Sequence, residues 1–252
     1  MANKKNSKST YKIELAEAKK ELLITRNANR VTTVGQIILG AQDGIVNVLG
    51  IVLGIAIATN NSILVLLAGF AGASAESISM AAVAYTTAKT RKDYYDAMWA
   101  KEEYEIKVMP RIEKLEVRVI YSEKGFRGKA LDNIVKTVCS DKNLWIKTMM
   151  KEEHGLSESE NEHPVKEGIV VGLSAFIGSI LPLIVFVFVP LISVTEASIA
   201  SIVLSAIVLF GIGYYKGKII GRGIFKSGIE LAIIGIIAAI VGFLIGVVFT
   251  II

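Results

Sequence analysis

The chain has 252 residues, of which 52% are hydrophobic and 20% are charged, and its formal net charge is +5. Soluble domains carry about 25% charged residues, and a mean hydropathy of +0.54 is high for such a domain. The composition excludes an intrinsically disordered chain and a collagen-like fold. The single cysteine, Cys139, excludes an intrachain disulfide.

The charged residues are distributed unevenly along the chain. Residues 90–167 hold 31 of the 51 charged residues and residues 1–30 hold another 11, which leaves nine in the other 144 residues. Five stretches outside these segments are long and apolar enough to cross a bilayer, which requires about 20 residues. They are 31–59, 62–88, 168–195, 197–215 and 231–252. We therefore predict an all-α integral membrane protein with five transmembrane helices.

Basic residues predict the orientation of these helices. They are concentrated in residues 1–30 and between the last two predicted spans, whereas the segments near Asn60 and Glu196 contain no lysine or arginine. The positive-inside rule then places the N-terminus and residues 90–167 in the cytosol and the C-terminus outside. Since the basic residues are explained in this way, we expect no nucleic-acid partner.

Residues 1–30 are polar and basic and lack the apolar core of a signal peptide. They are predicted to form either an amphipathic helix on the inner leaflet or a solvated tail. Because no targeting segment is recognisable, we expect a multi-pass protein of a prokaryotic plasma membrane.

The second predicted span has no obvious end before Pro110. No proline occurs between Ser62 and Met109, and one helix over 62–109 would be about 72 Å long. The hydrocarbon core needs only about 30 Å of it, so we expect the rest to form a cytosolic stalk.

Short helices are predicted beyond this stalk. One begins at Pro110 and reaches about Ser122, and others cover 129–139 and 142–154. Ser140 or Asp141 can cap the last of them, and Gly155 can end it. The predicted organisation is a cytosolic segment (1–30), transmembrane helices 1 and 2 (31–89), a helical cytosolic domain inserted between helices 2 and 3 (90–167), and helices 3 to 5 (168–252).

Two carboxylates lie inside the predicted membrane helices, where a charge is costly and indicates function. Asp43 lies midway along the first helix, with Gln36 and Asn47 on the same face. Glu76 lies midway along the second helix, and Met80 follows one turn later. Carboxylate oxygens suit hard divalent cations, and a thioether adds a preference for softer transition metals.

The cytosolic segment is rich in glutamates at helical spacing. Glu102 and Glu105, and likewise Glu113 and Glu116, are three residues apart and so face one way. Carboxylate pairs on neighbouring helices are how helical bundles hold metal ions. A solvated charged face explains the same spacing equally well.

Three small-xxx-small patterns indicate close helix packing. They are Gly40/Gly44, Gly50/Gly54 and Gly242/Gly246. Packing within the chain and a dimer seam both fit them.

In their order along residues 31–252, these motifs resemble the vacuolar iron transporter family, which includes yeast-type vacuolar iron and manganese carriers and nodulin-like proteins. The matching positions include Asp43-Gly44, Ser79-Met80, Glu102-Glu103-x-Glu105, Glu113, Glu116, Gly125-Phe126-x-Gly128 and Met149-Met150-x-Glu152-Glu153-His154-Gly155. The family often has a glutamate two turns before the methionine of the second span. This chain has Gly72 there, and we expect Glu76 to replace that glutamate.

The resemblance implies a homodimeric transporter that moves Fe²⁺, or Mn²⁺, out of the cytosol in exchange for protons. It implies that Asp43 and Met80 line the translocation path at the dimer interface, and we add Asn47 and Glu76. It implies metal ligands in the cytosolic domain, namely Glu102, Glu105, Glu113, Glu116, Met149 and Glu153, and we keep Glu103, Met150, Glu152 and His154 as secondary candidates. Divalent metal ions are then both substrate and ligand, and we expect no prosthetic group.

Two alternatives differ in class. The cytosolic carboxylates could form a ferroxidase, but only His154 lies near them, whereas di-iron bundles use two Glu-x-x-His motifs. A membrane-anchored metal sensor would leave Asp43 and Glu76 without a role. We therefore predict a transporter and not an enzyme.

Overall fold

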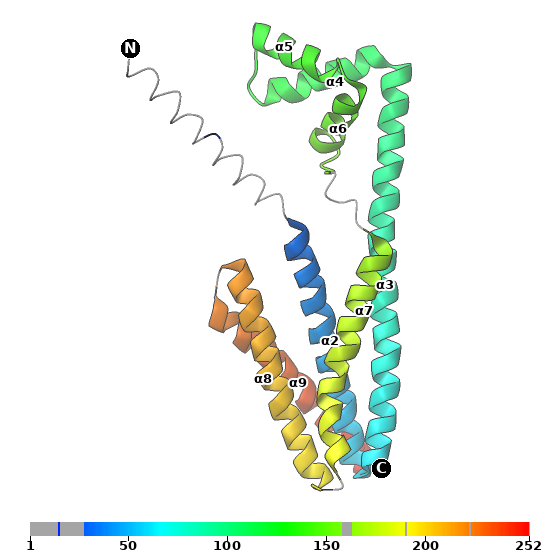
Figure 1. Ribbon diagram of the computed structural model, residues 1–252, viewed down its shortest axis with the longest axis vertical. Helices are drawn as coiled ribbons and strands as arrows, with labels where there is room; N and C mark the ends of the chain where they lie inside the picture. Colours follow the sequence, from blue (N-terminus) through cyan, green and yellow to red (C-terminus); the bar gives the residue numbers. More distant parts are fainter. Residues whose placement is uncertain (1–14, 16–27, 158–162, 190, 222, 252) are drawn as a thin grey trace, which may run out of the picture. The chain divides into compact units, whose positions relative to one another are not determined.

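Figure 1 shows a computed structural model of the chain, which describes residues 15, 28–157, 163–189, 191–221 and 223–251. All regular structure in these residues is helical, as predicted. The amphipathic segment predicted over 1–30 lies outside the described residues, apart from residues 15 and 28–30. The helices are α2 (Ala28–Thr59), α3 (Ser62–Val108), α4 (Pro110–Glu123), α5 (Gly128–Val138), α6 (Lys142–Glu152), α7 (Pro164–Ile184), the 3₁₀ helix η2 (Val185–Phe188), α8 (Val194–Ile220) and α9 (Ile224–Ile251).

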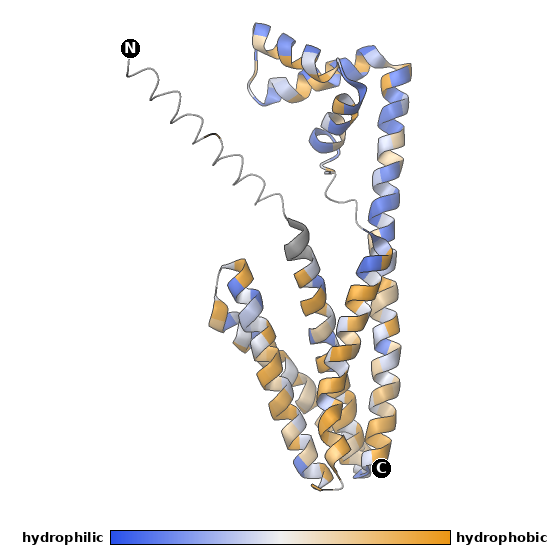
Figure 2. Cartoon of the chain, in the orientation of Figure 1, coloured by the Kyte–Doolittle hydropathy of each residue, from blue (hydrophilic) through white to orange (hydrophobic). Residues whose placement is uncertain are grey.

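Within the described residues, five helical segments are long and apolar enough to cross a membrane, which confirms the predicted number. They are Thr33–Thr59, Ser62–Val108, Pro164–Phe188, Val194–Ile220 and Ile224–Ile251. Figure 2 shows apolar residues along these segments and hydrophilic residues in α4 to α6 and the last part of α3. The chain is therefore a multi-pass membrane protein.

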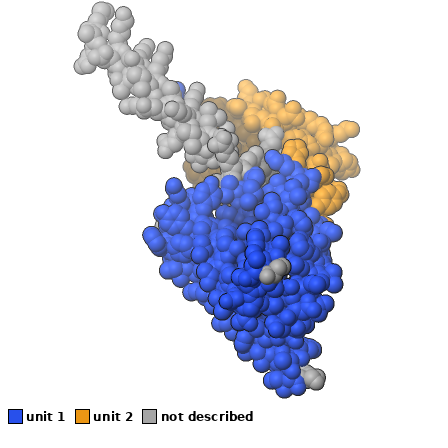
Figure 3. Space-filling view, turned by 60° about the horizontal axis from the view of Figure 1, so that its bottom comes forward, with its two compact units in different colours: residues 1–84, 166–252 blue, residues 85–165 orange. Residues whose placement is uncertain are grey.

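The chain divides into two compact units, which Figure 3 distinguishes by colour. Unit 1 contains the residues up to Ala84 and from Lys166 onward, and unit 2 is Tyr85–Val165. Helix α3 contributes its first part to unit 1 and its last part to unit 2. Its bounds agree closely with the helix predicted over 62–109, and its role as a cytosolic stalk stays a prediction.

Helix α2 packs against α7 and α9 through backbone contacts that only glycine permits. A methyl group on Gly44 would lie 2.1 Å from the carbonyl oxygen of Ala175 on α7. One on Gly242 of α9 would lie 2.3 Å from the carbonyl oxygen of Gly50 on α2. Both distances are far below the contact distance of non-bonded atoms. All three small-xxx-small patterns therefore serve packing within unit 1.

Unit 2 folds around one apolar cluster. Pro110 begins α4 at the position that tolerates proline, so that Met109 alone joins α3 to α4. Asp141, and not Ser140, caps α6, because its carboxylate accepts a hydrogen bond from the Leu144 amide at 2.7 Å. The buried members of the cluster are Tyr95, Ile106, Val117, Leu131, Val135, Val138, Trp145, Ile146, Met149 and Met150.

Helix α6 ends at Glu152, two residues before the predicted end at His154. The amide groups of Glu153 and His154 both donate to the carbonyl oxygen of Met149, at 2.9 and 3.3 Å. Gly155 then adopts a φ of +67°, which favours glycine, and turns the chain away. Glu153 and His154 therefore project from the end of the helix and do not continue its surface.

We expect Gly242→Ala to lower the thermal stability of the protein, because the added methyl group cannot fit against the backbone of α2. Overpacking of this kind costs about 1–3 kcal/mol. Gly211→Ala on α8 is the matched control, since a methyl group there meets nothing within 4 Å. The measurement is the thermal midpoint of helical circular dichroism for the full chain in detergent. Equal midpoints for the two variants would contradict the proposed packing.

Candidate functional site

Three polar side chains meet between α2 and α3 inside the apolar unit 1. Asn47 donates a hydrogen bond from Nδ2 to Oε1 of Glu76 at 2.5 Å, and the side chain of Asp43 interacts directly with that of Glu76. Met80 follows one turn after Glu76 on the same face of α3, and both side chains are half-buried. We call Asp43 and Glu76 the membrane pair. The structure thus brings together Asp43, Asn47 and Glu76, with Met80 on the adjacent turn.

Gln36 does not extend this polar face as the sequence suggested. Its Nε2 donates to Oε2 of Glu167, near the start of α7, at 2.6 Å. Glu167 is a buried carboxylate, 8% exposed, and it was not among the predicted site residues because it directly precedes an uncharged stretch. Pro164 could have indicated this position. Proline is common at the start of a helix, and a helix that begins at Pro164 has Glu167 in its first turn.

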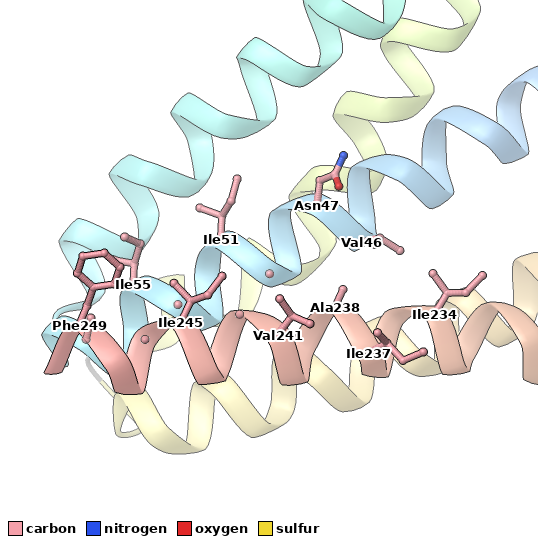
Figure 4. A pocket seen from close by; sticks show the side chains of 15 residues that line it. Val46, Asn47, Ile51, Ile55, Ile234, Ile237, Ala238, Val241, Ile245 and Phe249 are labelled. Carbon is pink, nitrogen blue, oxygen red and sulfur yellow. The ribbon is translucent and has the colours of Figure 1, made fainter. Parts of the chain in front are cut away.

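A groove of about 760 Å³ lies beside the membrane pair, between α2 and α9. Among the described residues that line it, Asn47 alone is polar. Figure 4 shows the side chains of α9 beside the groove and Asn47 directed away from α9. The groove itself adds no carboxylate, so the ligand chemistry of this region is confined to the contact between α2 and α3.

In unit 2 the glutamates of α3 and α4 lie close together. Glu102 is 1% exposed and Glu113 is 3% exposed. Glu113 is near enough to Glu102, Glu105, Glu116 and Glu153 to be affected by the charge of each. We call these five residues the glutamate cluster.

The end of α6 completes this cluster. Nε2 of His154 lies 2.8 Å from Oε1 of Glu102. Ligand atoms of Glu102, Glu153 and His154 all lie within 4.8 Å of one another, which is a spacing that a metal ion can bridge. Because α6 ends at Glu152, the side chains of Glu153 and His154 lie beside Glu102.

Burial, together with repulsion between neighbouring carboxylates, raises the pKa values of two glutamates in the cluster. Burial, followed by the neighbouring carboxylates, raises the pKa of Glu113 to about 7. Burial and three nearby glutamates also raise the pKa of Glu116. The cluster is therefore poised to exchange protons for a cation near neutral pH.

Two buried oxygens in the cluster accept no hydrogen bond from the described residues. They are Oε2 of Glu102 and Oε2 of Glu113. Leaving a buried polar atom without a partner is costly, the more so for a charged group. A cation bound beside either oxygen would satisfy it, and oxygen-rich sites of this kind suit Mg²⁺, Mn²⁺ and related divalent ions.

The other predicted ligands of unit 2 are placed differently. Glu103 forms an ion pair with Lys142 at 2.6 Å, and Glu152 forms one with Lys124. Met149 and Met150 are buried in the apolar cluster. Of the glutamates that the sequence made candidates in this unit, the structure gathers five in the glutamate cluster and pairs Glu103 and Glu152 with lysines.

Comparison with known proteins gives one consistent result. The model of the VIT family matches residues 34–247. "Vacuolar iron transporter 2" of Oryza sativa subsp. japonica is 31% identical over 90% of this chain and 93% of its own length. "Vacuolar iron transporter 1" of Arabidopsis thaliana is 29% identical over 90% and 92%. "Vacuolar iron transporter" of Toxoplasma gondii is 33% identical over 83% and 72%.

The pKa of Glu113 predicts how stability depends on pH. Between its ordinary value of 4.5 and about 7, folded Glu113 keeps a proton that the unfolded chain has lost. The stability of the metal-free protein should therefore fall as the pH rises from about 4.5 through 7. Trp99 and Trp145 both lie in unit 2, so tryptophan fluorescence reports the unfolding of this unit.

Glu113→Gln should reduce this pH dependence, because glutamine does not titrate, while Glu116 still contributes part of it. Glu123→Gln, at the exposed end of the same helix, is the control and should retain it. A fluorescence midpoint that rises with pH in the unmodified protein would be inconsistent with the raised pKa.

Proposed function

Since the chain belongs to the VIT family, we propose that it carries divalent transition-metal ions, Fe²⁺ first and Mn²⁺ second, out of the cytosol in exchange for protons. The observation that carries this proposal is the contact between Asp43 and Glu76 within apolar helices. Two carboxylates at such a position repel each other unless a proton or a cation lies between them. A site that holds either one can exchange them across a membrane.

The proton exchange follows from the chemistry of the ligands. A carboxylate binds a metal ion only in its deprotonated form, so binding of the ion displaces the proton. Asn47 donates its hydrogen bond to one carboxylate oxygen of Glu76, and Asp43 interacts with the same side chain. Met80, one turn away, offers a thioether, which favours softer transition metals over Mg²⁺ and Ca²⁺.

We also propose that two copies of the chain enclose the path. Asn47 is exposed on the surface of α2 and Asp43 is half-buried there. A lipid tail cannot solvate such groups. A second copy placed along α2 would cover them and would fill the apolar groove between α2 and α9.

The glutamate cluster would collect metal ions before transport. Basic residues of the N-terminal segment and of the segment between α8 and α9 support a cytosolic position for residues 90–167; among them are Lys216, Lys218 and Lys226. A carboxylate cluster there would raise the local concentration of divalent ions. The observation that favours this role is its two buried oxygens that accept no hydrogen bond from any described residue.

Asp43→Asn should reduce metal uptake into proteoliposomes to the level of protein-free liposomes, because the membrane pair loses one of its two charges. Calorimetric binding of Mn²⁺ by the glutamate cluster should persist in this variant. Glu230→Gln is the control, since Glu230 is an exposed carboxylate on α9 away from the membrane pair. Uptake should be measured under an imposed pH gradient, and undiminished Fe²⁺ uptake by Asp43→Asn would overturn the proposed path.

Replacing Glu113 and Glu116 together with glutamine should weaken Mn²⁺ binding by about tenfold or more, because changes even outside the first ligand shell cost 10- to 100-fold. The measurement is titration calorimetry of the full chain. Glu123→Gln on the same helix should bind as the unmodified protein does. An unchanged isotherm for the double variant would remove the glutamate cluster from the proposal. Oxygen consumption on addition of Fe²⁺ would instead indicate a ferroxidase.

A further inference from the structure

His154 has a position that an ordinary ion pair does not explain. Its Nε2 atom lies 2.8 Å from Oε1 of Glu102, and the two side chains are 14% and 1% exposed. One imidazole faces a cluster of five carboxylates, and a single positive charge cannot balance them. Among the other described groups, Lys101 forms an ion pair with Glu105 at 3.4 Å. Oε2 of Glu102 is buried and accepts no hydrogen bond from the part of the chain that the structure describes.

His154 lies close enough to Glu102 and Glu153 for all three side chains to share one ion. Zinc lies about 2.0–2.2 Å from imidazole nitrogens and carboxylate oxygens. In zinc's usual tetrahedral geometry, two such ligand atoms are therefore about 3.4 Å apart. The separation of 2.8 Å between His154 and Glu102 is that of a hydrogen bond, so these two atoms need to move apart only slightly to hold an ion between them. Glu153 has an oxygen within 4.8 Å of both ligand atoms.

We propose that His154 is a nitrogen ligand of the metal bound in the glutamate cluster, and that it sets the metal preference of this cluster. The inference rests on the proposed function only in that the cluster must bind metal. Carboxylates suit Mn²⁺ and Mg²⁺, whereas imidazole suits zinc, iron and nickel. Adding one imidazole to carboxylates therefore shifts the selectivity of the cluster from Mn²⁺ toward Fe²⁺ and Zn²⁺.

The position of His154 is set by the backbone and not by the imidazole alone. Its amide donates to the carbonyl oxygen of Met149 at 3.3 Å, and the amide of Leu156 donates to that of Met150 at 2.8 Å. Because these bonds do not involve the ring, replacing the side chain should leave the end of α6 in place. The ring can therefore be removed as a ligand without removing the carboxylates.

The chain offers a matched control, because it contains two histidines. His163 is exposed and lies outside the group formed by Glu102, Glu153 and His154. His154→Leu removes the proposed ligand, and His163→Leu removes an equivalent ring elsewhere. His154→Gln is the second variant, since glutamine can still hydrogen-bond to Glu102 but carries no imidazole.

The deciding measurement is electron spin-echo envelope modulation of the full-length protein in detergent, loaded with one equivalent of Mn²⁺. Modulation from an imidazole ¹⁴N bound to Mn²⁺ is expected in the unmodified protein and in His163→Leu. It should be lost in His154→Leu and in His154→Gln. Tryptophan fluorescence checks that unit 2 is folded in each variant.

A competition titration tests the selectivity. Both His154 variants should lose about tenfold or more in Zn²⁺ affinity, with a smaller loss for Mn²⁺. Equal losses for the two metals would overturn the assigned selectivity.

The outcomes separate the inference from the function on which it rests. Calorimetric binding of Mn²⁺ without ¹⁴N modulation would overturn the role of His154 and leave the glutamate cluster as a metal site. Loss of the modulation in His163→Leu would mean that the nitrogen ligand is His163 and not His154, and it would overturn the inference. Failure of the unmodified protein to bind Mn²⁺ or Zn²⁺ would overturn the metal-collecting role of the cluster and this inference with it.

Discussion

A carboxylate removed from water must be compensated by hydrogen bonds, by opposite charge or by a cation, and this requirement governs both units. In unit 1 the compensation comes from amides, since Asn47 donates to Glu76 and Gln36 donates to Glu167. An amide donates a hydrogen bond without adding charge. The negative charge of the membrane pair is therefore not cancelled within the described chain, and a proton or a cation can still bind there.

The close packing of α2 makes this arrangement possible. Glycines bring its backbone against α7 on one side and against α9 on another, with Gly44 and Gly50 at the contacts. Close backbone packing is the main source of association between membrane helices, which lack a hydrophobic driving force. Gly69 and Gly72 of α3 in turn lie against Val52 and Ile51 of α2, in the helix pair that carries the contact between Asn47 and Glu76. The polar contact thus depends on residues that have no polar side chain.

Much of the architecture could be predicted from the sequence because it depends on local pattern. The five apolar segments, the break at Pro110 and the i, i+3 spacing of the glutamates are all signals within a few turns of helix. The partners of Gln36 and His154 could not be predicted, since they lie 131 and 52 residues away in the chain. The end of α6 was predicted two residues late, because helical periodicity does not reveal that two amides share the carbonyl oxygen of Met149.

The difference between the two sites suggests how they would divide one task. Around the membrane pair, the neutral neighbour of Glu76 is an amide that donates a hydrogen bond, so it competes with a metal ion for the carboxylate and favours release. In the glutamate cluster, the neighbour of Glu102 is an imidazole, which can itself bind the ion and so favours retention. A transport site must release its ion on the far side of the membrane. A collecting site must bind the ion even when the concentration of the free ion is low. On the functions proposed here, each carboxylate has the kind of neighbour that its step requires.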